Sequence, residues 1–271
     1  MANKTCRRQM MDPSAIAETQ WLIREAWATV GRSSPSGRIL ALPGACIVDS
    51  GQPWLFTNGV FLNEPIASPA DLKALAEAAL NHFRPSGHEW FLSASEEWLG
   101  PSADEVLSGL GLIHAMTVIA MAADQLLPPT RPLPDVVVRR IDDEDTRLVI
   151  AELNAAAYDV SLEWGHRAVG HGRLWQEPLF GHVAYIDGIP AAAGFAIPIA
   201  GALYVAWLAT ASPYRGRGLA ELVMRRSLAE ARLATGIERT VLHATQEGLG
   251  LYRRMGYLPV ASYPLWEPAH P

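Results

Sequence analysis

Hydrophobic positions in this chain recur with two spacings, and segments of each kind alternate along its length. Spacings of three and four residues predict amphipathic helices, while strict alternation or short continuous apolar runs predict strands. The helical pattern covers Ala15–Val30, Asp71–Phe83, Ala103–Ser108, Asp142–Tyr158 and Leu219–Ala234. The strand pattern covers Arg38–Val48, Pro53–Leu62, Glu89–Ser93, Ile113–Ala122, Val136–Ile141, Gly181–Ile186, Ile189–Ile197, Leu203–Thr210, Glu238–Ala244 and Val260–Trp266. Helices and strands mixed in this way predict an α/β fold.

One stretch, 189–214, carries no charged residue and is long enough on paper to span a bilayer. However, Pro190, Pro198 and Pro213 interrupt it, and a proline inside a helix costs about 3 kcal/mol. Two buried strands joined by a turn near Pro198–Gly201 fit the pattern better, because strands covered on both faces read as continuous apolar runs. We therefore expect no membrane association.

A proline-rich segment, L-L-P-P-T-R-P-L-P at Leu126–Pro134, divides the chain almost in half. Its four prolines cannot continue a helix or a central strand, so it predicts a linker. We place the domains at residues 1–127 and 135–271, with 128–134 between them. Within the second domain, Asp187-Gly188 is a strong signal for a two-residue hairpin turn.

Composition narrows the classes of function. The chain has 271 residues, of which 49% are hydrophobic and 18% charged, and this suits a globular protein with a substantial core. Its net charge of −6 argues against a nucleic-acid-binding surface. The two cysteines, Cys6 and Cys46, indicate neither a disulfide framework nor a zinc cluster. The first residues lack the apolar core of a secretory signal, so we expect a cytoplasmic protein.

The segment Tyr214–Ala220 carries the most chemical information, because it joins a predicted strand to a predicted helix through two glycines. Such a corner exposes backbone N–H groups at a helix N-terminus, where the helix dipole favours an anion. Glycine lets a phosphate approach the backbone closely. The corner therefore predicts a site for a phosphate-bearing cofactor.

Three phosphate motifs compete for this corner. The P-loop pattern G-x-x-x-x-G-K-[ST] is absent, and the dinucleotide pattern G-x-G-x-x-G fits only in part, because Glu221 occupies the place of its third glycine. The pattern R-x-x-G-x-A is matched in full by Arg215, Gly218 and Ala220.

A second motif follows near the C-terminus. The pattern L-Y-x-x-x-G-[FY] is matched by Leu251, Tyr252, Gly256 and Tyr257. With the glycine corner ahead of it, this order resembles the GNAT superfamily of N-acetyltransferases. The resemblance implies the GNAT fold, a mixed and mostly antiparallel sheet flanked by helices. Many members carry Asn before the last helix, where this chain has Thr245-Gln246, so the contact of that Asn with pantetheine is in doubt here.

The resemblance implies acetyl-CoA as the cofactor. Its pantetheine arm would lie along the strand before the corner and its pyrophosphate on the corner amides. The implied cofactor-binding residues are Leu208, Ala209, Thr210, Arg215, Gly216, Arg217, Gly218, Leu219, Ala220 and Tyr252. Tyr252 is also the candidate general acid, since a phenol with a pKa near 10 is protonated at neutral pH. The general base stays open between His243, Glu163, His166 and a water relay. His166 and His171 lack metal-ligand spacing, so we expect no metal.

The first half echoes the second and is identified as a degenerate half of a tandem GNAT protein. Its strand-to-helix corner, Asn63–Pro69, contains neither glycine nor arginine. Two of its residues, Pro65 and Pro69, lack an N–H donor, so this corner is a poor phosphate cradle. We expect the first half to support the fold or to shape the acceptor pocket.

Together these patterns predict an acetyl-CoA-dependent N-acetyltransferase that acts on a small-molecule amine, as a monomer or homodimer. A non-catalytic acyl-CoA-binding sensor is the alternative, because it would share the glycine corner without needing Tyr252. A nucleotide-dependent oxidoreductase would need the missing third glycine of the dinucleotide pattern.

Overall fold

The fold is described by a computed structural model that covers residues 12–269. Its internal contacts divide the chain into two compact units. Of the described residues, the first contains 12–121, His243–Leu249 and 258–269, and the second contains Ala122–Leu242 and Gly250–Tyr257. The boundary at Met121 lies close to the proline-rich segment, while the return of the C-terminal residues to the first unit makes that unit discontinuous. The domain boundaries given above stay a prediction.

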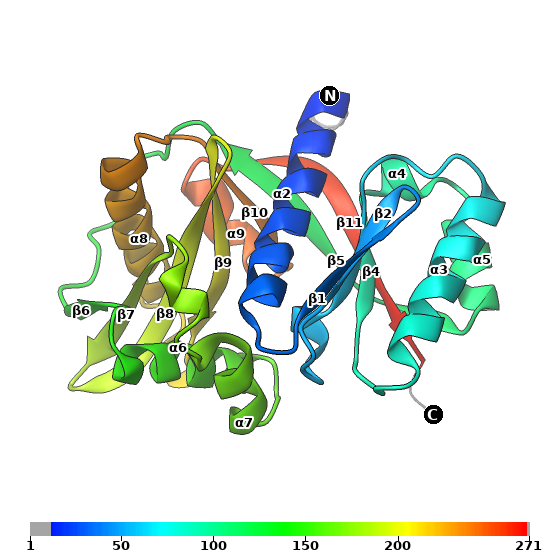
Figure 1. The fold of residues 1–271 in the computed structure, drawn as a ribbon. Coiled ribbons are helices and arrows are strands. Elements are labelled where there is room, and N and C mark those ends of the chain that lie inside the picture. The colour runs from blue at the N-terminus through cyan, green and yellow to red at the C-terminus, as the bar shows by residue number, and fades with distance from the viewer. Residues whose placement is uncertain (1–11, 270–271) are drawn as a thin grey trace. The chain divides into compact units, whose positions relative to one another are not determined.

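The first unit begins with helix α2 (Pro13–Ser33), which Asp12 caps through a bond from the Ser14 amide. Its other helices are α3 (Pro69–Phe83), α4 (Glu96–Leu99) and α5 (Ala103–Gly109). Its strands are β1 (Arg38–Leu42), β2 (Ala45–Asp49), β3 (Gly59–Leu62), β4 (Phe91–Ser93), β11 (Leu258–Pro268) and β5 (Leu112–Ala123), in that order across the sheet. Strands β1 to β3 are antiparallel, and β4 runs parallel to β3 beyond the crossover helix α3 (Figure 1).

The predicted single strand over 38–48 is wrong, because the chain turns back within it. Residues Pro43-Gly44 separate β1 from β2, and Gly44 adopts a φ of +67° that only glycine tolerates easily. The predicted strand over 53–62 is likewise shorter, since Leu55–Thr57 form one 3-10 turn before β3. Both errors come from apolar runs that read as continuous strand despite the turn residues inside them.

The C-terminal strand β11 belongs to the sheet of the first unit. Its Leu265 and Trp266 pair antiparallel with Ser93 and Leu92 of β4. Its Tyr263 hydroxyl makes a buried 2.8 Å hydrogen bond with the Thr19 hydroxyl of α2. The first unit is therefore built from both ends of the chain.

The second unit is a mostly antiparallel sheet covered by two long helices. Its strands are ordered β10 (Thr240–Ala244), β9 (Ala202–Thr210), β8 (Ile189–Ile199), β7 (Phe180–Ile186) and β6 (Val137–Arg140). The last two residues of β10, His243 and Ala244, belong to the first unit. Helices α6 (Glu144–Ala157) and α8 (Leu219–Thr235) pack on it (Figure 1). The short helix α7 (Leu162–Gly165) contacts α6, and a second short helix, α9 (Leu249–Arg254), follows β10. The predicted hairpin turn is confirmed: Asp187 and Gly188 have φ values of +51° and +80°.

The apolar stretch from 189 to 210 forms the two neighbouring strands β8 and β9, as predicted. Within the described residues, no helix is long and apolar enough to cross a membrane.

Strand β9 contains a bulge close to its C-terminal end. Ala193 pairs with Ala209 and Phe195 with Ala206, so Gly194 alone faces the two residues Trp207 and Leu208. Trp207 takes a φ of +55°, which is uncommon for a residue with a side chain. A Cβ at Gly194 would lie 2.7 Å from a methyl carbon of Leu208, so the bulge requires a glycine opposite it.

Candidate functional site

Helix α8 begins without a side-chain cap, unlike the other long helices. Asp12, Ser68 and Asp143 cap α2, α3 and α6 by accepting from first-turn amides. At α8 the N-cap position is Gly218, with a φ of +83° and no side chain to accept from those amides. The first intrahelical bond of α8 runs from the Leu222 N–H to the Gly218 oxygen, so the amides of 219–221 have no helical acceptor. These donors are available to an anion.

The uncapped end of α8 opens into a hollow of about 140 Å³. Strand β9, the glycine corner, helix α9 and the proline-rich segment all contribute to its wall. The lining residues are Arg131, Thr210, Tyr214, Arg215, Gly216, Gly218, Leu219, Ala220, Glu221, Leu251 and Arg254. The two sequence motifs, which lie more than 30 residues apart, therefore meet around one cavity.

The charges around the hollow favour an anionic guest. Three exposed guanidinium groups line it, those of Arg131, Arg215 and Arg254. In the described part of the chain, no carboxylate pairs with any of the three within 4.0 Å. The single lining carboxylate, Glu221, is buried and engaged by Arg225 at 2.8 Å. The hollow thus combines helix-end amides with unpaired positive charge.

Strand β9 leaves its neighbour β10 just before the bulge. The two pair in parallel only at Leu203–Thr240 and Tyr204–Val241, whereas pairing with β8 continues to Thr210. Beyond Tyr204, one edge of β9 therefore runs without β10 toward the hollow. An extended chain with amide groups could add to such an edge as a further strand.

Asn154, on helix α6, is hydrogen-bonded to the bulge of β9. Its side-chain amide donates to the Ile150 oxygen at 2.9 Å and to the Trp207 oxygen at 3.1 Å, and the residue is fully buried. The unusual backbone of Trp207 is therefore anchored to α6. Because an unbonded buried carbonyl costs about 1–3 kcal/mol, this contact is part of what makes the bulge stable.

Tyr252 lies on α9 and is half-buried. Burial raises the pKa of its phenol above the ordinary value of 10.0, and the nearby Tyr158 adds a smaller effect in the same direction. Its ring is 5.8 Å from that of Tyr257, which is fully buried. The Tyr252 hydroxyl is therefore protonated throughout the physiological range, the state that a proton donor requires.

Two of the predicted base candidates contact other charged side chains in and just after α7. The Glu163 carboxylate on α7 lies 3.0 Å from Arg167, and a ring nitrogen of His166 is hydrogen-bonded to Glu152 at 3.2 Å. The third, His243, lies in the first unit, where its ring meets Tyr263 edge-on at 4.5 Å. Burial lowers the pKa of His243 to about 3, which makes it a weak proton acceptor. The identity of the base stays a prediction.

The structure brings six of the sequence-predicted cofactor residues to the hollow: Thr210, Arg215, Gly216, Gly218, Leu219 and Ala220. Leu208 and Ala209 lie on β9 at and after the bulge, and Tyr252 follows the lining residue Leu251 on α9. Arg217 is not among the lining residues; its guanidinium lies over the ring of Tyr214 at 5.4 Å. Sequence reasoning missed Arg131 and Arg254, because neither belongs to the matched motif positions.

The corresponding corner of the first half is closed by its own side chains. Ser68 accepts from the Asp71 amide at 3.2 Å, and Pro69 follows at the first helical position of α3. The nearby hollow carries the carboxylates of Glu64 and Asp71. These acidic groups and the capped helix disfavour a phosphate there.

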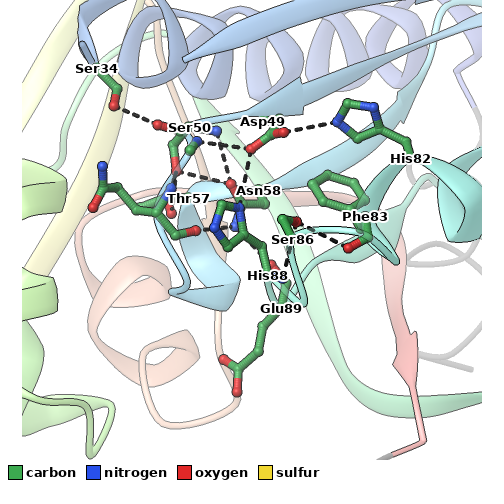
Figure 2. Close-up of polar contacts among 12 residues, drawn as sticks. Ser34, Asp49, Ser50, Thr57, Asn58, His82, Phe83, Ser86, His88 and Glu89 are labelled. Carbon is green, nitrogen blue, oxygen red and sulfur yellow. Dashed lines mark hydrogen bonds and ion pairs between the residues drawn. The ribbon is translucent and has the colours of Figure 1, made fainter. Parts of the chain in front are cut away.

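A polar cluster of the first unit surrounds the ends of β2 and β3 (Figure 2). The buried Asn58 amide donates to the oxygens of Gln52, Trp54 and Glu89, and its own oxygen accepts from Ser50. Asp49 accepts from Gly51 and pairs with His82 at 2.8 Å (Figure 2). Because Asn58 and Asp49 use their hydrogen-bonding groups on neighbouring loop residues, we interpret the cluster as a structural one that stabilises these loops.

Comparison with known proteins gives a family match in the second half. Residues 170–259 match the family described as acetyltransferase (GNAT) domain. These residues include the bulge, the glycine corner and α9. The comparison with curated proteins found no match.

Solved structures match nearly the whole chain. A GCN5-related N-acetyltransferase from Kribbella flavida shares 19% identity with a TM-score of 0.69, over 93% of this chain and 96% of that one. A GCN5-related N-acetyltransferase from Sphaerobacter thermophilus shares 16% at a TM-score of 0.59, over 93% and 91% of the two chains. A tandem GNAT protein from the clavulanic acid biosynthesis pathway shares 12% at 0.57, over 94% and 95%. This protein therefore has the GNAT fold, and its residues 170–259 match the acetyltransferase (GNAT) domain.

Proposed function

We propose that this protein transfers an acetyl group from acetyl-CoA to the amine of a small molecule. The observation that carries the proposal is the uncapped N-terminus of α8, which opens into a hollow lined by the guanidinium groups of Arg131, Arg215 and Arg254. That combination of backbone donors and positive charge is matched to a pyrophosphate. The GNAT match over 170–259 supports the acetyl donor.

The residues present fit coenzyme A. Amides at 219–221 and the Arg215 side chain would hold the pyrophosphate, and the edge of β9 at Leu208, Ala209 and Thr210 would hold the pantetheine amides. When bound, acetyl-CoA supplies an acetyl group activated as a thioester. The close approach that the corner needs is provided by Gly216 and Gly218, at φ values of +76° and +83°.

The transfer needs a proton donor, and Tyr252 is the candidate. An amine that attacks the thioester must be neutral, and the departing sulfur needs a proton as the bond breaks. The raised pKa of Tyr252 keeps its hydroxyl protonated. We propose Tyr252 as the general acid, with the acceptor amine deprotonated by water or by one of the predicted bases.

Two measurements test the proposal. Isothermal titration of the purified protein with acetyl-CoA and with CoA measures binding. Release of free thiol from acetyl-CoA, followed with a thiol-reactive dye, measures turnover with a panel of amino acids, polyamines and aminoglycosides. We expect micromolar binding and amine-dependent thiol release.

The two readouts separate the competing functions. Binding without thiol release across the whole panel would favour a non-catalytic acyl-CoA sensor. Absence of binding by either ligand would remove the coenzyme from the proposal altogether. Titration with NAD serves as a negative control, because the dinucleotide pattern is incomplete at Glu221.

A further inference from the structure

The proline-rich segment belongs to the second unit and is hydrogen-bonded to other parts of it. The Leu127 N–H donates to the Met255 oxygen at 2.9 Å, and Arg225 donates to the Leu127 oxygen at 2.8 Å. A Cβ at Gly256 would lie 2.9 Å from Leu127, so the segment packs directly against the glycine of the second motif. The sequence predicted a simple linker here, whereas these contacts make it part of the wall of the hollow.

Arg131 of this segment lies at the glycine corner. Its guanidinium donates to the Gly216 oxygen at 3.1 Å. A Cβ at Gly218 would lie 3.4 Å from a terminal nitrogen of the same group and 3.4 Å from Pro134. The guanidinium therefore borders the corner that presents the unpaired amides of α8.

This contact leaves most of the hydrogen-bonding capacity of Arg131 unused. A guanidinium has five N–H donors, and the bond to Gly216 uses one terminal nitrogen. Holding a long exposed side chain over a single carbonyl gains little, because the lost rotamer freedom offsets such a bond. An anion in the hollow would give the remaining donors a charged partner, and such bonds are about twice as strong as neutral ones.

We propose that Arg131 binds the pyrophosphate of coenzyme A, so that the segment joining the two halves completes the coenzyme site. This inference rests on the proposed function and extends it to a residue outside both motifs. The buried carboxylate of Glu221 does not cancel the charge of Arg131, because Arg225 already neutralises it. Arg131 thus acts as a ligand to the coenzyme, positioned by its bond to Gly216.

The test is titration calorimetry of CoA and 3′-dephospho-CoA against four proteins: the unaltered chain, Arg131→Ala, Arg131→Gln and the control Arg226→Ala. Arg226 is an exposed arginine of α8 that does not line the hollow. Gln at 131 can still donate to the Gly216 oxygen, so it separates loss of charge from loss of that bond. Melting temperatures without ligand show whether each variant is folded.

We expect both Arg131 variants to bind CoA on the order of 10-fold more weakly, in keeping with the loss of one charge-assisted contact. The same factor should appear with 3′-dephospho-CoA, and Arg226→Ala should bind as the unaltered chain does. Raising the salt concentration should reduce the difference in CoA affinity between Arg131→Gln and the unaltered chain, because salt screens the charge of Arg131.

Three results would overturn the inference while leaving the proposed function intact. Folded Arg131 variants could bind CoA with unaltered affinity. The loss could vanish with 3′-dephospho-CoA, which would assign Arg131 to the 3′-phosphate. Arg226→Ala could weaken binding equally, which would indicate only a general electrostatic field. If the unaltered chain bound no CoA, the proposed function would fail first, so the two failures are distinguishable.

Discussion

At the scale of single residues, both the sequence motif and the protonation state of the phenol favour Tyr252 as a proton donor. Its raised pKa follows from burial, and a protonated phenol next to Leu251, which lines the hollow, is suited to protonate a departing thiolate. The sequence could predict the residue from its motif. It could not predict the raised pKa, because burial depends on side chains brought together from α9 and Tyr158.

Replacing Tyr252 with Phe is expected to lower kcat by about 100-fold or more, because it removes the proposed proton donor. The affinity for acetyl-CoA should change little, since the proposed pyrophosphate contacts lie on other residues. Steady-state kinetics and titration calorimetry measure the two effects separately. The nearby Tyr158→Phe variant is the matched control, and equal kcat values for the two variants would exclude Tyr252 as the acid.

The burial of His243 leads us to predict that the protein loses stability in acid. Its pKa is lowered by burial from 6.5 to about 3 in the folded protein. The unfolded chain therefore binds a proton at higher pH than the folded one does, so the free energy of unfolding falls as the pH drops from 6.5 toward 3. His182, whose pKa is lowered to about 4 mainly by burial, contributes to the same loss.

The variant His243→Phe cannot be protonated at this position. We expect urea unfolding between pH 7 and pH 4 to lose less stability in this variant than in the unaltered chain, whatever its stability at pH 7. A pH dependence equal to that of the unaltered chain would show that His243 does not carry the effect.

At the scale of elements, helix α8 is flanked by glycines and has no side chain that caps its N-terminus. Gly218 before the helix and Gly236 after it both adopt left-handed backbone, with φ values of +83° and +72°. Alanine at either position should cost about 1 kcal/mol of stability, because its Cβ is strained there. The two glycines thus form a matched pair on one helix.

Of Gly218 and Gly236, only Gly218 borders the hollow. We therefore expect Gly218→Ala and Gly236→Ala to lower the melting temperature by similar amounts, while only Gly218→Ala weakens CoA binding. Thermal unfolding and calorimetry of the two variants check this, and a binding loss shared by both would mean that helix stability, not the corner, controls affinity.

Element prediction succeeded where the pattern was unambiguous. The hairpin at Asp187-Gly188 and the helix from Leu219 were predicted from local residues, and both are present. The β9 bulge had no sequence signature, since Trp207 is an ordinary strand residue. Its conformation depends on Asn154 of another helix and on the missing side chain of Gly194.

At the scale of the whole molecule, the first unit depends on the C-terminal strand. β11 brings the buried side chains of Tyr263, Leu265 and Trp266 into it. We expect residues 1–127 expressed alone to lack a cooperative thermal transition, because a strand of the sheet and its apolar side chains are missing. The whole chain is the control.

Adding a peptide of residues 258–269 should restore part of the structure of this fragment, measured by circular dichroism. A fragment 1–127 that folds cooperatively without the peptide would contradict this dependence and support the domain boundaries predicted from the proline-rich segment.

The sequence by itself predicted that the second half resembles GNAT proteins, because the glycine corner and the L-Y-x-x-x-G-Y helix are local patterns, and their glycines Gly216, Gly218 and Gly256 all take positive φ values. Tertiary structure alone decided that β11 joins the first unit, that Arg131 borders the glycine corner and that Asn154 holds the bulge. Each of these is a contact between segments distant in the chain. Local patterns reflect the conformational preferences of neighbouring residues. Contacts between distant segments form only when the whole chain folds and buries its apolar side chains.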